Sequence, residues 1–342
     1  MFVFELLDWH EIPWDELDRF KDRNIFQTRS WLQFLSETQS ARPVVARITC
    51  TDGCIGYVTG LIVSKMGVRI FASPFKGWTT AYMGFNVQPG YARSEVSKAF
   101  SSFVFKNLGC HHFEMTDRNL RAEDCTGLSY QVRFYKTYEL DLAQSEEELF
   151  AHMDSACRRC IRKADKCGVV IEEADAEGFA GEYYAQLREV FGKQNLTPTY
   201  GIDRVRQLIK HVHPTGNLLL LRARDDQGRS IATGIFPGLN DTAYFWGGAS
   251  WREYQILRPN EAIFWYAMRY WKSRGAGRLD LGGLGAYKEK YGCSMIQVPH
   301  LIKSKYRIVT ALRDVAQNLW KVQKKIQGKF RTSALGHPRV EN

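Results

Sequence analysis

The 342-residue sequence has no apolar run near the roughly 20 residues that a membrane-spanning helix needs. It also lacks a phosphate-binding P-loop, a dinucleotide-binding glycine fingerprint and a recognisable Ser-His-Asp or Cys-His arrangement. The eight cysteines have no framework spacing, which indicates free thiols in a reducing compartment. The first residues, MFVFELLDWHEIPW, carry acids rather than a basic segment, so we expect no signal peptide and a cytoplasmic location.

One group of side chains could in principle bind a metal ion. Cys157, Cys160 and Cys167 follow closely on His152. A structural zinc site usually has a second Cys-x2-Cys pair, or two histidines at fixed spacing, and this sequence has neither. We therefore expect no bound metal.

Apolar residues and uneven charge are the main features of the composition. Hydrophobic residues make up 44% of the chain, enough for one very large or two ordinary domains. The net charge is +10, and +8 of it lies in residues 303–342, where apolar residues recur at helical spacing. We expect a basic amphipathic helix there, able to attract the phosphates of RNA or of an anionic membrane.

An internal repeat predicts two similar domains. Each half of the sequence reads as a strand hairpin, a further strand, a helix and a last strand, which is typical of a mixed sheet with helices on its faces. The fold class is therefore α+β, with domains at residues 1–140 and 141–302 followed by the basic segment 303–342. The paired segments are 44–48 with 218–223, 55–63 with 231–236, 80–84 with 242–247, and 112–115 with 279–281.

The stretch Leu257–Gly292 is the part most indicative of function. Pro259 followed by Asn260 predicts a helix start with Asn260 as N-cap, and Gly275 predicts the stop. A short strand then contains one acid, Asp280, and ends in two glycines that let the backbone turn sharply.

Several motifs, taken in order, resemble the Fem family, the aminoacyl-tRNA-dependent transferases that build peptidoglycan cross-bridges, and their relatives in the GNAT acyltransferase superfamily. The resemblance spans roughly residues 25 to 300 and implies two tandem GNAT-like domains, with the active site in the second domain, in the cleft between the two. The matching segments are Phe26-Gln27-Thr28 with Trp31, the arginine-rich segment 158–169, Arg258-Pro259-Asn260, Asp280-Leu281-Gly282-Gly283, Tyr287-Lys288 and Tyr291-Gly292.

The resemblance implies amide-forming transfer of an acyl group to an amine, with Lys288, Asp280 and Tyr291 as catalytic residues. Such a reaction needs a donor to the developing oxyanion, and Lys288, in a loop after the glycine pair, fits that role unless it is a solvated lysine. Asp280 would orient the amine or a lysine, or would only brace the turn. The candidate substrate-binding residues are Arg258, Asn260, Tyr287, Trp246, Arg158, Arg159, Arg162 and Lys163.

The donor that the sequence favours is an aminoacyl-tRNA, with acyl-CoA as the alternative, and no other cofactor is expected. The segment Tyr254–Ala262, where an acetyl-CoA enzyme would hold the pyrophosphate, contains no glycine, and Pro259 removes a backbone donor. However, the long tRNA-holding arm of Fem enzymes is absent, because residues 168–218 leave room for only two ordinary helices.

The acceptor could be a peptidoglycan precursor, a polysaccharide amine or a small natural product. The basic segment 303–342 could also make a peripheral membrane contact. A non-catalytic protein that binds RNA or membranes through this segment is the remaining alternative, although such a protein would not require the loop from Asp280 to Gly292.

Overall fold

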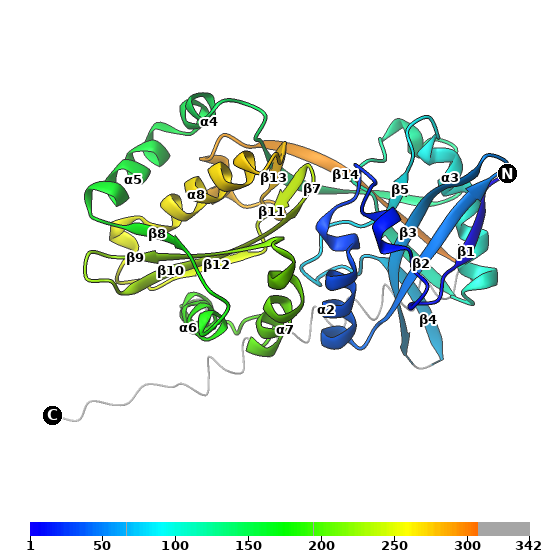
Figure 1. Ribbon diagram of the computed structural model, residues 1–342, viewed down its shortest axis with the longest axis horizontal. Helices are drawn as coiled ribbons and strands as arrows, with labels where there is room; N and C mark the ends of the chain where they lie inside the picture. The colour runs from blue at the N-terminus through cyan, green and yellow to red at the C-terminus, as the bar shows by residue number, and fades with distance from the viewer. Residues whose placement is uncertain (66, 194, 307–342) are drawn as a thin grey trace.

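The computed structural model describes residues 1–65, 67–193 and 195–306 (Figure 1). Most of the predicted basic helix, residues 307–342, lies outside them. The first half of the chain holds the following elements: β1 (Val3–Leu6), α1 (Trp14–Leu17), a 3₁₀ turn (Ile25–Gln27), α2 (Arg29–Gln39), β2 (Arg42–Cys50), β3 (Gly53–Lys65), β4 (Val68–Ser73), β5 (Phe85–Val87), α3 (Arg93–Ser102) continued by a π turn (Phe103–Asn107), β6 (His112–Thr116), a 3₁₀ turn (Glu123–Cys125) and β7 (Gln131–Asp141).

The second half begins at a capping box, in which the Ser145 side chain accepts from the Glu148 N–H and the Glu148 side chain accepts from the Ser145 N–H. Its elements are α4 (Glu146–His152), α5 (Ser155–Lys166), β8 (Val170–Glu173), α6 (Phe179–Gly192), α7 (Ile202–Val212), a 3₁₀ turn (His213–Thr215), β9 (Leu218–Arg224), β10 (Ser230–Leu239), β11 (Thr242–Tyr244), β12 (Gly247–Ser250), a 3₁₀ turn (Gln255–Leu257), α8 (Pro259–Ser273), β13 (Arg278–Asp280), α9 (Ala286–Glu289) and β14 (Ser294–Ser304). Between β8 and β9 the described residues form the two expected helices, α6 and α7, and a short 3₁₀ turn.

The two halves repeat the same strand order, and the α+β fold is confirmed. In the first half β1, β2, β3 and β4 pair antiparallel in sequence, and β4 then pairs parallel to β6. In the second half β8, β9, β10 and β11 do the same, and β11 pairs parallel to β13. Even the side branches match, since β5 joins β3 and β12 joins β10.

The last strand of each half is exchanged between the halves, which the sequence did not predict. β7 follows β6 in the chain but pairs with β13, and β14 follows β13 but pairs with β6. β7 and β14 also pair with each other, so all the strands form one continuous sheet (Figure 1). The division at residues 140 and 302 stays a prediction about separate domains. Lys303 and Ser304 belong to β14, so the expectation of a helix from residue 303 is wrong at its start.

Helices cover the second half's strands on both faces, with α5 and α8 on one side and α6 and α7 on the other (Figure 1). Helix α7 packs against α2 of the first half, which joins the two halves through a shared core. Phe26 belongs to the same core, and its ring lies 5.1 Å from that of Tyr244. Gln27 is fully buried and donates a hydrogen bond to the Met83 carbonyl at 2.8 Å, so the Phe-Gln motif has a packing role. Within the described residues, no helix has the length and apolar character to cross a membrane.

Candidate functional site

The glycine pair after β13 forms a sharp turn at the centre of the molecule. Gly282 and Gly283 have φ angles of +75° and +85°, a region that other L-residues rarely adopt. A β-carbon at Gly282 would also lie 3.0 Å from the Phe245 carbonyl oxygen. The turn therefore requires glycine for both its conformation and the space around it.

Asp280 braces this turn from one side. Its Oδ1 accepts hydrogen bonds from the Thr137 hydroxyl at 2.6 Å and from the Gly282 backbone N–H at 2.8 Å. Thr137, on β7, in turn accepts a hydrogen bond from the Gly283 N–H at 2.8 Å. The carboxyl group is fully buried, and burial raises its pKa to about 6 against the pull of these hydrogen bonds. Its second oxygen, Oδ2, has no hydrogen-bond partner among the described residues.

Lys288 clamps the turn from the other side. Its ammonium group donates to the carbonyl oxygens of Gly282 at 3.0 Å and Gly283 at 3.2 Å. The side chain is buried, so the alternative of a solvated lysine is wrong, and burial lowers its pKa. Because an ammonium group carries three N–H donors, one remains for a further partner.

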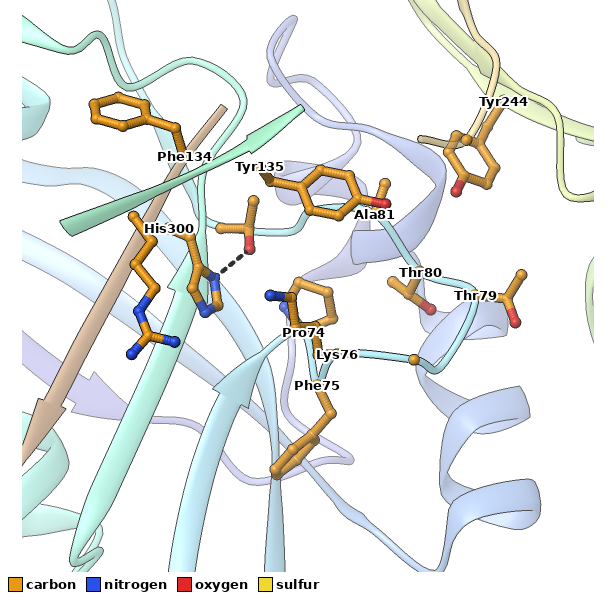
Figure 2. A pocket seen from close by; sticks show the side chains of 14 residues that line it. Pro74, Phe75, Lys76, Thr79, Thr80, Ala81, Phe134, Tyr135, Tyr244 and His300 are labelled. Atoms are coloured by element: carbon orange, nitrogen blue, oxygen red, sulfur yellow. Dashed lines mark hydrogen bonds between the residues drawn. The ribbon is translucent and has the colours of Figure 1, made fainter. Parts of the chain in front are cut away.

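A pocket of about 270 Å³ opens beside the turn, between the two halves of the chain (Figure 2). Gly282 and Tyr244 line it from the second half, and Tyr135 lines it from β7. The opposite wall comes from the loop after β4, residues 74–81, and from the facing ends of β6 and β14. The predicted cleft between the halves thus adjoins the glycine turn.

Three tyrosines surround Asp280, and sequence reasoning missed all of them. Tyr82, Tyr135 and Tyr244 each have a raised pKa, mainly through burial and in part through the nearby Asp280 carboxylate, so they stay protonated at neutral pH. The hydroxyls of Tyr135 and Tyr244 border the turn, each within about 3.2 Å of where a glycine β-carbon would stand. Figure 2 shows these two hydroxyls directed toward each other across the pocket. Tyr244 ends β11, Tyr135 lies within β7 and Tyr82 precedes β5, so no local sequence signal indicates that the three meet.

The first half has a counterpart of Asp280 in Asp117, which follows β6. Both carboxylates accept the backbone N–H two residues further on, Asp117 from Asn119 at 2.9 Å and Asp280 from Gly282 at 2.8 Å. Asp117 also pairs with Arg93 at 2.8 Å. Arg118, whose charge acts on Asp280, is instead bonded to Glu139. Asp280 therefore differs from Asp117 in having no directly bonded cation among the described residues.

Tyr291 and Trp246 lie in the hydrophobic core rather than on the wall of the pocket. Tyr291 stacks on Phe264 with ring centroids 4.6 Å apart, and Trp246 lies 5.0 Å from the ring of Tyr200. Both side chains are almost completely buried. Tyr287 is exposed, and its ring lies 5.5 Å from the Lys288 ammonium.

The start of α8 differs from the expectation. The helix begins at Pro259 and Arg258 precedes it in a left-handed conformation, so Asn260 as N-cap is wrong. Proline already has the φ angle that the first helical residue needs, which moves the start one residue earlier. The Asn260 side chain instead donates to the Ser250 hydroxyl at 3.1 Å, and Arg258 is exposed at the helix end.

The basic residues of α5 are not among those that line the pocket. Arg158 donates to the Ala151 carbonyl at 2.6 Å and so closes the end of α4. Arg159, Arg162 and Lys163 are exposed on the outer side of the second half. The junction of α4 and α5 does touch the loop that carries Lys288, because the Asp154 N–H donates to the Lys290 carbonyl at 2.9 Å.

Comparison with known proteins bears on this site. Residues 151–291 match a family model described as an acetyltransferase (GNAT) domain. Among solved structures, FemX is similar over 86% of this chain and 96% of its own, with 14% identity and a TM-score of 0.69. L-PGS from Bacillus licheniformis is similar over 84% and 94%, with 11% identity and a TM-score of 0.51. A conserved protein of unknown function from Bacteroides thetaiotaomicron is similar over 89% of this chain and 100% of its own, with 13% identity and a TM-score of 0.58. None of the curated proteins matches the chain.

The matched GNAT domain runs from α4 through the Asp280 turn and Lys288 to Tyr291. Together with the repeated strand order, it defines this protein as an acyltransferase with a tandem GNAT fold. The similarity to FemX over nearly its whole length shows that the two proteins share this fold.

Proposed function

We propose that the protein transfers an aminoacyl group from aminoacyl-tRNA to the amine of an acceptor bound in the pocket between its halves. The observation that carries this proposal is the glycine turn, held between buried Asp280 and buried Lys288 at the edge of that pocket. FemX and L-PGS as structural neighbours favour aminoacyl chemistry for this fold. A peptidoglycan precursor, a polysaccharide amine and a small natural product remain the candidate acceptors.

In this mechanism the residues around the turn bind and polarise the carbonyl group that the amine attacks. Lys288 offers its remaining N–H to the oxyanion, and the hydroxyls of Tyr135 and Tyr244 border the same place. Asp280 and Thr137 position the turn through its backbone N–H groups. Tyr291, buried in the core, acts by packing the loop against Phe264.

The start of α8 favours tRNA over CoA as the donor. A helix N-terminus binds anions when its free N–H groups face the ligand, but Pro259 has none to offer. The Glu261 carboxylate also lies in this first turn, 2.6 Å from the Lys290 ammonium. Its negative charge repels a pyrophosphate at the helix start. The exposed Arg159, Arg162 and Lys163 could instead meet the phosphates of an RNA, which spread over a wider surface.

An acyl-CoA donor is the second candidate, because the matched family model is described as an acetyltransferase. The two donors separate in one experiment. We expect weak or undetectable acetyl-CoA binding by calorimetry, since each missing charge-assisted hydrogen bond costs about 1.5–3 kcal/mol. We expect RNase-sensitive transfer of an amino acid from charged tRNA. Low-micromolar acetyl-CoA binding together with RNase-resistant transfer would make CoA the donor.

The basic C-terminal segment should contribute salt-dependent binding to polyanions. A chain ending at Tyr306 keeps all of β14 but removes eight of the ten basic residues of segment 303–342. Its affinity for RNA and for anionic vesicles should fall. The plot of log K against log salt concentration should also become less steep. The matched control is a full-length chain with Arg159, Arg162 and Lys163 changed to glutamine. If only this control loses binding, the anion site is on α5, and the segment has no such role.

A further inference from the structure

A second polar cluster forms the wall of the pocket opposite the glycine turn. Thr116 at the end of β6 lies directly across from His300 on β14, and both line the pocket. The Thr116 hydroxyl and the His300 Nδ1 are 2.8 Å apart, the bond drawn as a dashed line in Figure 2. The other ring nitrogen, Nε2, lies 3.3 Å from the Glu114 carboxylate.

These contacts set the direction of the hydrogen bonds. A carboxylate only accepts, so Glu114 favours the tautomer with the proton on Nε2 of His300. Nδ1 then carries a lone pair, and the Thr116 hydroxyl donates to it. The result is a hydroxyl, an imidazole and a carboxylate in series, the order that activates a hydroxyl or accepts a proton in other enzymes.

The cluster is placed for chemistry in the pocket, and Asp280 is not. All three side chains are at least nine-tenths buried, and strand pairing on both β6 and β14 fixes them. Asp280 has a suitable pKa, about 6, but it is not among the residues that line the pocket. Its hydrogen-bonded oxygen already holds the turn.

We propose that Thr116, His300 and Glu114 accept the proton that acyl transfer releases from the attacking amine. This inference rests on the proposed function. The neutral amine forms the N–C bond, its proton passes to the Thr116 oxygen, and the threonine proton passes to Nδ1. When the bond from the carbonyl carbon to the leaving oxygen or sulfur breaks, the imidazolium returns a proton to that atom, so the enzyme ends unchanged.

Charged side chains also line the pocket. Arg133 lies opposite His300 on β7, and Lys76 is on the loop after β4. On β6, His112 lies two residues before Glu114 and is hydrogen-bonded to the Ser304 hydroxyl at 2.7 Å.

The test is the rate of transfer as a function of pH in full-length variants, with charged tRNA and with acyl-CoA as donors. His300→Ala should lower the rate by about 10²- to 10⁴-fold and remove the limb that reports deprotonation of a base. Added imidazole should restore part of the rate. Thr116→Val should be impaired and Thr116→Ser close to wild type. The exposed His10→Gln is the matched control, and thermal melts check folding.

The outcomes separate the two proposals. If the wild type transfers but His300→Ala keeps the rate within a few-fold, the relay is overturned alone. The same holds if the rate falls with an unchanged pH profile and no rescue by imidazole, because His300 would then be structural. If the wild type transfers from neither donor to any amine, the proposed function fails and the relay fails with it.

Discussion

Replacing Lys288 with alanine should lower the turnover of acyl transfer by about 100-fold or more, the usual effect of losing one oxyanion donor. The buried ammonium group supplies the one N–H that is not bonded to Gly282 or Gly283. Its loss also leaves those two carbonyl oxygens without their donor. The measurement is kcat in whichever donor assay proves active, with substrate binding followed separately.

A second variant separates catalysis from support of the turn. Lys288→Met keeps the length and packing of the side chain but has no donor, so it should be as inactive as the alanine variant while melting closer to wild type. Lys290→Gln, in the same loop, loses the ion pair to Glu261 and the contact of its ammonium group with the Tyr291 ring, and it serves as the control. A Lys288→Met enzyme within a few-fold of wild-type turnover would remove Lys288 from the mechanism.

Asp280→Asn should stabilise the protein at pH 8 and have little effect near pH 4. Folding raises the carboxyl pKa from 3.8 to about 6. The free energy of unfolding therefore decreases as pH rises from 4 through 6. Above pH 6 this loss of stability is about 3 kcal/mol. Asparagine can still accept the Thr137 and Gly282 hydrogen bonds but carries no charge. Thermal and denaturant unfolding between pH 4 and 8 would measure the difference.

Asp117→Asn is the matched control in the first half. Asp117 also braces the turn after its strand, but its charge is paired with Arg93, so the same substitution should destabilise rather than stabilise at pH 8. Equal losses of stability in both variants would show that the Asp280 carboxylate is not strained by burial. If Asp280→Asn is more stable yet inactive, the charge serves the reaction at the expense of the fold.

The sequence predicts features that depend on local chemistry. Residue type and spacing indicate the glycine pair after the strand that contains Asp280, the Ser145 capping box and the repeated strand-helix-strand order. The error at Asn260 arose because two good start signals, proline and asparagine, stand side by side and proline takes the first helical position.

The features that could not be predicted depend on pairing between distant residues. Thr137 reaches the turn only because β7 crosses to β13, and His300 meets Thr116 only because β14 crosses to β6. Nothing in the residues flanking these strands indicates which partner each will find. The tyrosines around Asp280 come from three separate segments for the same reason, so the turn was predicted and its surroundings were not.

The exchange of β7 and β14 also affects how the chain can fold as it is synthesised. The edge of β6 that β14 covers stays open until residue 304 has left the ribosome. Such late, long-range pairing slows folding and leaves a strand edge exposed to other chains meanwhile. A ribosome that stops before β14 therefore releases a chain in which β6 lacks its neighbouring strand and the pocket lacks His300.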